Sequence, residues 1–170
     1  MTDLSGQDPH GPLQEAAGEP LDPLAAIMLV MEASFDPRWG EAWNERQVAS
    51  SLAMPSTRYV LVAADGSEPQ SPQETAGFAM TRAAPGEEEL LLIAVRPEHR
   101  RSGLGAHLLD ILSGSARERG AERIFLEMRE NNPAVSLYDA AGFAPIGRRK
   151  AYYKLSDGSR LDAITFARTL

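Results

Sequence analysis

The segment from Val95 to Ala106 carries the clearest chemical signal in this sequence. It reads Val-Arg-Pro-Glu-His-Arg-Arg-Ser-Gly-Leu-Gly-Ala. The apolar run before it predicts a strand and the apolar periodicity after it predicts a helix, so the chain turns through two glycines into a helix N-terminus. Such an N-terminus presents unpaired N–H groups and the positive end of the helix dipole, and Arg100 and Arg101 add charge. The pattern therefore predicts a phosphate-binding site.

Three kinds of nucleotide site could use such a loop. A Walker A loop requires Lys after its last glycine, and here Ala106 follows Gly105, so this possibility fails. A dinucleotide fingerprint requires a third glycine where Leu108 stands, so it is a weak match. The third pattern is Arg100-x-x-Gly103-x-Gly105. The structural alternative to a binding site is a glycine-rich turn that begins a helix and binds no ligand. We disfavour it because a strand, two arginines and the glycine spacing occur together here.

The spacing Arg100-x-x-Gly103-x-Gly105 resembles the pyrophosphate loop of the GCN5-related N-acetyltransferase (GNAT) family. A second match begins at Asn132 and reads Asn-Pro-Ala-Val-Ser-Leu-Tyr-Asp-Ala-Ala-Gly-Phe. It keeps the family's Asn, Leu-Tyr and Gly-Phe, but its Ala follows the Asn more closely than in the family pattern. The resemblance implies a GNAT fold that uses acetyl-CoA and no metal.

Further segments resemble one branch of that family, the bacterial ribosomal-protein-alanine N-acetyltransferases of the RimI type. They read Leu-Glu-Met-Arg at 126–129, Arg-Arg-Lys-Ala-Tyr-Tyr at 148–153, Asp-Gly at 157–158 and Asp-Ala-Ile at 162–164. The resemblance covers about residues 24–168 and is strongest from Leu91 onward. It implies that a GNAT domain over residues 21–170 acetylates a protein N-terminal amine, with the N-terminal Ala of a small-subunit ribosomal protein as the expected acceptor.

The resemblance also assigns roles to single residues. Glu127 matches the base that takes the amine proton, and Tyr138 matches the acid that protonates the departing thiolate of coenzyme A. An α-amino group has a pKa of about 7.7 to 8.0, so a modest base suffices. The residues that the resemblance assigns to the cofactor are Ile93, Ala94, Val95, Arg100, Arg101, Ser102, Gly103, Leu104, Gly105, Ala106 and Asn132.

Each of these roles has a structural alternative. Glu127 could pair with Arg129 or face solvent, Tyr138 could pack on the sheet, and Asn132 before Pro133 could be a helix N-cap. Three residues of the last segment match the wall of the acceptor site in relatives, with structural roles as an equal alternative: Tyr152, Tyr153 and Asp162. The acidic run at 87–89 could attract a cationic peptide, although charge runs are more often solvated turns.

The elements that must position these residues can be outlined from periodicity and turn residues. We expect helices from Asp22 to about Met31, at 40–53, from Leu104 to Ala116 with Gly120 as cap, and at 133–141. Strands are expected at 59–64, 76–81, 89–95, 123–128, 151–155 and 163–167. The run at 89–95 is apolar on both faces, which is typical of a central strand. The order predicts an α/β or α+β fold with a mixed, mostly antiparallel central sheet and helices on both faces.

The composition of the chain excludes several classes of protein. The chain has 170 residues, 43% of them hydrophobic, and no cysteine, which excludes a disulfide framework and a thiolate metal site. Residues 1–20 are rich in Pro and Gly and contain four Asp or Glu and no Lys or Arg, so we expect a flexible acidic tail. The net charge of −7 disfavours nucleic-acid binding. No apolar run approaches the roughly 20 residues that span a bilayer, and no signal peptide is visible, so we expect a cytoplasmic protein without membrane contact.

Several functions remain open on these residues alone. A GNAT enzyme could act on another protein terminus, a Lys side chain or a small amine. A sensor could bind acetyl-CoA without turnover, although the presence of both Glu127 and Tyr138 disfavours it. A dinucleotide-binding oxidoreductase is the third class, and it would be distinguished by whether NAD(H) or coenzyme A stabilises the protein.

Overall fold

The computed structural model describes residues 20–36, 41–155 and 157–170. The expected flexible tail lies outside the described residues, apart from Pro20, which is exposed. The helices are α1 (Pro23–Ser34), α2 (Glu45–Leu52), α3 (Leu104–Glu118) and α4 (Val135–Ala140), with short 3-10 helices η2 (Pro72–Glu74) and η3 (Pro97–His99). The strands are β1 (Thr57–Ala63), β2 (Thr75–Ala84), β3 (Glu87–Val95), β4 (Arg123–Arg129), β5 (Ala144–Lys154) and β6 (Arg160–Thr169).

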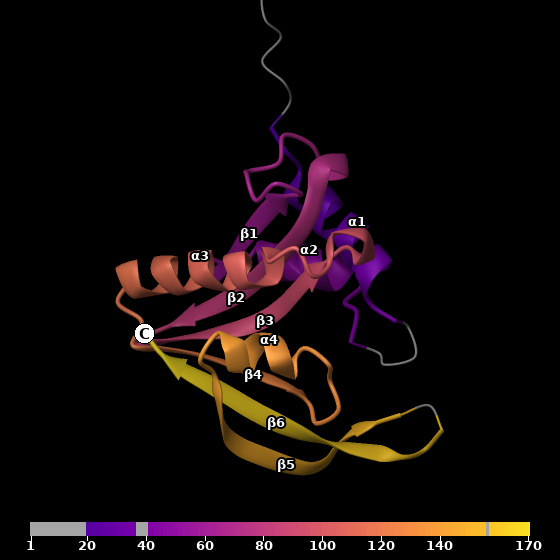
Figure 1. The fold of residues 1–170 in the computed structure, drawn as a ribbon, viewed down its shortest axis with the longest axis vertical. Helices are drawn as coiled ribbons and strands as arrows, with labels where there is room; N and C mark the ends of the chain where they lie inside the picture. The colour runs from indigo at the N-terminus through magenta and orange to yellow at the C-terminus, as the bar shows by residue number, and fades with distance from the viewer. Residues whose placement is uncertain (1–19, 37–40, 156) are drawn as a thin grey trace, which may run out of the picture.

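One six-stranded sheet with the order β1-β2-β3-β4-β6-β5 organises the fold. Its strand pairs are antiparallel except for β3 and β4, which are parallel. Helices α1 and α2 bury their apolar sides on one face, and α3 and α4 cover the other (Figure 1). The predicted mixed, mostly antiparallel sheet with helices on both faces is therefore confirmed.

Local capping explains where the first two helices begin. The Asp22 side chain accepts a hydrogen bond from the Leu24 N–H at 2.9 Å, and Pro23 takes the first helical position. The second helix begins at Glu45, so the predicted start at residue 40 was wrong. Asn44 forms a capping box with Gln47, in which each side chain accepts the other residue's backbone N–H at 2.9 Å.

The last hairpin differs more from expectation. Strand β5 begins at Ala144, seven residues before the predicted start at 151. It is an edge strand whose residues are almost all exposed, so it lacks the alternation of apolar and polar residues on which strand prediction depends. Pairing with β6 decides its length, and a register shift between Arg149 and Tyr153 interrupts that pairing.

The central strand β3 contains an irregularity that opens the sheet. Its register with β2 places Met80 opposite Leu92 and Thr81 opposite Leu90, so Leu91 is an extra residue and forms a β-bulge. Leu90 packs in the core beneath α3, whereas Leu92 and Ala94 pack in the core beneath α1. The predicted central strand covered on both faces is confirmed, and the bulge redirects its last residues.

Strands β3 and β4 are paired only at their beginnings. Residues 87–89 pair with residues 123–125, and beyond this point the two strands run apart, as Figure 1 shows. The paired end is anchored by Glu88, whose side chain is 1% exposed and accepts hydrogen bonds from Arg119 at 2.6 Å and Thr81 at 3.1 Å. Glu87 pairs with Arg123. The acidic run at 87–89 therefore anchors the sheet rather than forming a docking surface.

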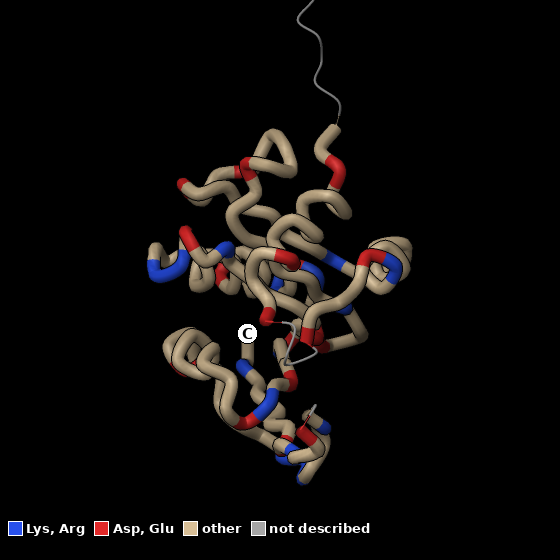
Figure 2. The backbone as a smooth tube through the Cα atoms, turned by 90° about the vertical axis from the view of Figure 1, so that its right-hand side faces the viewer, with Lys and Arg blue, Asp and Glu red and all other residues tan. Residues whose placement is uncertain are grey.

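Acidic and basic positions are interspersed along the tube in Figure 2, including the part formed by β4, β5 and β6. Within the described ranges, no helix is long and apolar enough to cross a membrane. The same residues contain no group of three or more His, Asp or Glu side chains arranged to hold a metal ion.

Candidate active site

A cleft of about 1260 Å³ lies where β3 and β4 separate, and we call it the β3–β4 cleft. It is lined by residues from β3, the N-terminal end of α3, β4 and α4, together with the chain before α2. The predicted site residues in its lining are Ile93, Ala94, Val95, Arg100, Arg101, Gly103, Leu104, Gly105, Ala106, Glu127, Asn132 and Tyr138. Ser102 is absent from this lining of the described chain, and its hydroxyl donates to the His99 carbonyl at 2.6 Å.

The N-terminus of α3 forms the cradle that the glycine spacing predicts. The helix ladder starts with the His107 N–H, which donates to the Gly103 carbonyl at 3.0 Å. Within the described chain no side chain caps this end, so the N–H groups of the first helical residues, 104–106, remain open toward the cleft. Gly103 has a φ of +89°, which a residue with a side chain adopts only with strain. The loop therefore presents several N–H donors and the helix dipole to one place.

The two arginines of the loop have different environments. The Arg100 guanidinium donates to the Ser34 carbonyl at 2.9 Å and the Val95 carbonyl at 3.2 Å. It thereby ties the loop to the ends of α1 and β3, a role that the sequence did not suggest. Arg101 has a φ of +66°, an unusual backbone conformation for a residue other than glycine, and its exposed side chain lies in the cleft lining. Its positive charge is thus available to an anion at the cradle.

Gly105 has a packing reason as well as its place in the cradle. A Cβ at this position would lie 3.2 Å from Leu137 Cδ2 and 3.4 Å from Leu137 Cδ1. The absence of a side chain at Gly105 therefore allows α3 and α4 to approach each other beside the cleft. This contact joins the two segments that carry the predicted motifs.

Glu127 lies on β4 where that strand has left β3. Ile124, Leu126 and Met128 point into the core beneath α3 and α4, so Glu127 points to the opposite face. Its carboxylate forms a two-pronged ion pair with Arg149 of β5. Arg149 Nε donates to Oε2 at 2.8 Å and Nη2 donates to Oε1. Glu127 therefore neither pairs with Arg129 nor faces solvent alone, the two alternatives that the sequence left open.

Tyr138 approaches the cleft from α4. Its ring is 6% exposed and meets Phe143 edge to face, with 5.8 Å between the ring centres. Burial raises the pKa of the Tyr138 hydroxyl well above its ordinary value, and the negative charge of Glu41 raises it further. Among the described residues this hydroxyl has no hydrogen-bond partner, so it is a protonated donor available to the cleft.

Asn132 is not the N-cap of α4, which is Ala134 and has no side-chain cap. The Asn132 Oδ1 accepts a hydrogen bond from the Ala134 N–H at 2.9 Å, which shapes the turn into α4. The same residue lines the β3–β4 cleft. The turn therefore holds the Asn132 side chain at the place where the resemblance expects a cofactor contact.

The other side of the cleft contains residues that sequence reasoning did not assign. Glu41, in the chain before α2, pairs with Arg129 of β4 at 2.9 Å, and the Arg129 side chain is 6% exposed. The two residues are separated by 88 positions, and no local pattern indicates this pair. Trp43 packs on the core beneath α1 and also lines the cleft.

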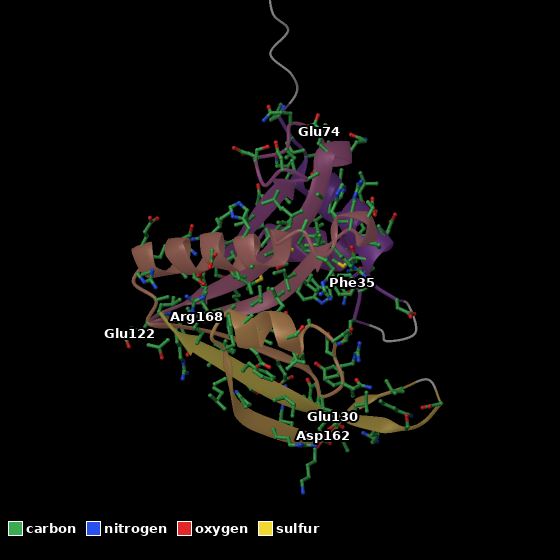
Figure 3. All side chains as sticks on the ribbon, viewed as in Figure 1. Phe35, Glu74, Glu122, Glu130, Asp162 and Arg168 are labelled. Carbon is green, nitrogen blue, oxygen red and sulfur yellow. The ribbon has the colours of Figure 1, made fainter. Side chains whose placement is uncertain are left out.

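Of the three candidates for the acceptor wall, Tyr153 lines the cleft, while the described lining does not include Tyr152 or Asp162. Burial and the charges of Glu127 and Glu41 raise the pKa of Tyr153. Asp162 instead bonds to Arg148 and to the Ala151 N–H, and these bonds lower the pKa of the Asp162 carboxyl. Figure 3 shows Asp162 beside Glu130, the second partner of Arg148.

The arrangement can perform acid–base chemistry at a bound anion-bearing ligand. The α3 cradle, the Glu127 carboxylate on β4 and the Tyr138 phenol on α4 all line the cleft. A carboxylate can accept a proton and a phenol with a raised pKa can donate one. The geometry thus suits a transfer reaction that needs one base and one acid.

Comparison with known proteins agrees with this description. The family model described as "Acetyltransferase (GNAT) family" matches residues 26–143. The ribosomal protein bS18-alanine N-acetyltransferase of Escherichia coli (strain K12) is 41% identical over 93 residues, which are 54% of this chain and 62% of that protein. The corresponding protein of Haemophilus influenzae is 36% identical over 91 residues, again 54% of this chain and 62% of the relative. The matches thus span about three fifths of these relatives.

Solved structures match over a larger part of the chain. The crystal structure of the ribosomal-protein-S18-alanine N-acetyltransferase from Escherichia coli has a TM-score of 0.71 and 31% sequence identity, and the match covers 86% of each chain.

Proposed function

The chain belongs to the acetyltransferase (GNAT) family, and on that premise we propose that it transfers the acetyl group of acetyl-CoA to a protein N-terminal amine. We assign the reaction to residues 21–170 and place it in the cytoplasm. The acceptor in this proposal is the N-terminal Ala of a small-subunit ribosomal protein. The observation that carries the proposal is that Glu127, Tyr138 and the α3 cradle line one cleft.

The residues present fit coenzyme A. The open N–H groups at the start of α3 and the Arg101 side chain suit a pyrophosphate, because they combine aligned donors with positive charge. The backbone of residues 93–95 lines the cleft beyond the point where β3 has left β4, so it can hydrogen-bond an extended arm of the ligand. When bound, acetyl-CoA supplies an activated acetyl thioester.

Glu127 and Tyr138 then carry out the proton transfers that the reaction needs. An α-ammonium must lose a proton before its nitrogen can attack, and Glu127 Oε1 or Oε2 accepts that proton directly or through water. The nitrogen then bonds to the acetyl carbon, and Tyr138 gives its hydroxyl proton to the sulfur as the carbon–sulfur bond breaks. The second proton that the nitrogen loses restores the Tyr138 hydroxyl. The raised pKa of Tyr138 keeps this proton in place at neutral pH. Glu127 lies on β4 and Tyr138 on α4, so the base and the acid come from different elements.

Two lines of support favour a protein N-terminus as acceptor. The relatives from Escherichia coli and Haemophilus influenzae are named for acetylation of an alanine of ribosomal protein bS18. Trp43 and Tyr153 also form partly buried walls of the cleft near Glu127. Such walls suit an acceptor whose first residue has a short, uncharged side chain better than one whose first side chain must stay in water. Acceptors with a Lys amine or a small-molecule amine are the alternatives that the experiment separates.

The direct experiment offers the protein acetyl-CoA and two peptides, one with a free N-terminal Ala and one with a blocked N-terminus and an internal Lys. Fragment mass spectrometry locates the added acetyl group. We expect acetylation at the free Ala terminus alone. Acetylation at Lys would replace the proposed acceptor with a side chain, and tight coenzyme A binding without any transfer would contradict the enzymatic proposal.

Gly105→Val tests the cradle. The added side chain would crowd Leu137 and cover the N–H groups at the start of α3, so we expect coenzyme A to bind about tenfold more weakly by calorimetry. Pantetheine, which lacks the pyrophosphate, is expected to lose less affinity.

Gly114→Val is the matched control for Gly105→Val. Gly114 lies in the same helix, and a Cβ there would meet no atom within 4 Å. This variant is expected to keep wild-type affinity for coenzyme A. Equal losses for coenzyme A and pantetheine in Gly105→Val would contradict a pyrophosphate site at this helix end.

A further inference from the structure

The candidate base, Glu127, already forms an ion pair with Arg149 of the same protein. Both nitrogens of one edge of the Arg149 guanidinium bond to both oxygens of the Glu127 carboxylate. This two-pronged geometry gives each oxygen a donor in the carboxylate plane, where a proton or an ammonium would otherwise bind. The guanidinium therefore occupies one donor position on each oxygen of the carboxylate.

The position of Arg149 is built by the β5–β6 hairpin. Its guanidinium carbon lies 3.8 Å from the centre of the Tyr152 ring, and the Tyr152 ring meets the Tyr153 ring edge to face. Ala151, between Arg149 and Tyr153 in sequence, has a φ of +53° and donates its N–H to Asp162 at 2.8 Å. The register shift between Arg149 and Tyr153 and the contact with the Tyr152 ring therefore direct Arg149 toward Glu127.

The neighbouring Arg148 makes different contacts, so the pairing with Glu127 is specific to Arg149. Arg148 bonds to Glu130 at 2.7 Å and to Asp162 at 2.5 Å, on the other face of the hairpin. Arg149 remains 54% exposed while it holds a carboxylate that is 21% exposed. It can therefore rotate into solvent without disturbing a buried core, and a cation that enters the cleft can take its place.

We propose that Arg149 shields Glu127 until an acceptor ammonium displaces it, so that the base serves an amine and not water. The inference rests on the proposed function, because it takes Glu127 as the base. An incoming ammonium takes the place of the Arg149 guanidinium, so the Glu127 carboxylate keeps a cation beside it. A neutral water molecule in that place would leave the negative charge of Glu127 without a cation. Arg149 is thus a specificity residue that selects a cationic acceptor over water.

The reaction that Arg149 suppresses is hydrolysis of the thioester. In that reaction a water molecule gives one proton to Glu127, and its oxygen bonds to the acetyl carbon. The carbon–sulfur bond breaks and the sulfur takes the Tyr138 proton. The acetic acid that forms returns its proton to Tyr138, so the products are acetate, coenzyme A and the proton on Glu127. No oxidant or further reactant is needed.

Arg149→Met tests the proposal by two measurements. Release of coenzyme A from acetyl-CoA without any acceptor is expected to rise about fivefold, since the base becomes open to water. Calorimetry with the N-terminal Ala peptide, in the presence of coenzyme A and therefore without turnover, is expected to show about fivefold tighter binding, since the ammonium no longer competes with a guanidinium. Unchanged hydrolysis, or weaker peptide binding, would overturn the proposal.

Two variants separate this proposal from simpler explanations. Lys150→Met removes one positive charge from the same strand without a contact to Glu127, and it is expected to leave hydrolysis and peptide binding at wild-type values. Equal effects in Lys150→Met and Arg149→Met would reduce the role of Arg149 to net charge and so overturn the proposal.

Glu127→Gln in the Arg149→Met background is expected to return hydrolysis to the wild-type level. If the double variant hydrolyses acetyl-CoA as fast as Arg149→Met, Glu127 does not activate the water, and both the proposal and the assignment of the base fail. If Arg149→Met leaves hydrolysis unchanged while Glu127→Gln abolishes peptide acetylation, the shielding role fails and the proposed function stands.

Discussion

Glu127→Gln is expected to lower kcat/KM for an N-terminal Ala peptide by about 100-fold or more, the lower end of the range for a general base. The amide has nearly the same shape as the carboxylate but cannot accept the proton of an ammonium. Coenzyme A affinity is expected to stay within about twofold of wild type, because the cradle lies at the start of α3 and not on β4. Steady-state kinetics with both substrates varied, together with calorimetry for coenzyme A, measures both quantities.

Glu130→Gln is the matched control for this prediction. Glu130 follows the same strand and also pairs with an arginine of β5, but it lies outside the cleft lining. Its substitution removes the same charge and is expected to change kcat/KM by less than about twofold. Full activity of Glu127→Gln would remove this residue from the mechanism, and equal losses in both variants would indicate a general charge effect.

Tyr138→Phe is expected to lower kcat by about 100-fold, because the sulfur then has no positioned proton donor when the carbon–sulfur bond breaks. The phenylalanine ring keeps the edge-to-face contact with Phe143, so the melting temperature is expected to change little. Tyr59→Phe, on the exposed edge of β1, is the control that loses a hydroxyl far from the cleft. Wild-type kcat in Tyr138→Phe would assign the proton to another group or to water.

The pH dependence of wild-type kcat gives an independent check on Tyr138. Its raised pKa means that the acid form persists as the pH rises through about 10, the ordinary value for tyrosine. We therefore expect no decline of kcat from this residue below about pH 10. A basic limb near pH 8 that disappears in Tyr138→Phe would contradict the environment described for this hydroxyl.

The sequence alone was sufficient to predict the parts of this protein that depend on local signals. The strand-turn-helix from Val95 to Ala106 could be predicted because strand, glycines and helix are neighbours in the chain. The same holds for the N-cap at Asp22 and for the inward and outward sides of β4 around Glu127. The motif at Asn132 and the segments resembling one branch of the family added the expected acid, base and acceptor.

The tertiary structure decided the features that join distant segments. The bulge at Leu91 is visible only from the register with β2, and it accompanies the separation of β3 and β4 that makes the cleft. The pairs Glu127–Arg149 and Glu41–Arg129 span 22 and 88 positions, and many carboxylates and guanidiniums in the chain could have paired instead. Local patterns specify which residues share a face of one element. Which charges meet across elements depends on strand order and register, because those alone set the distance between residues far apart in sequence.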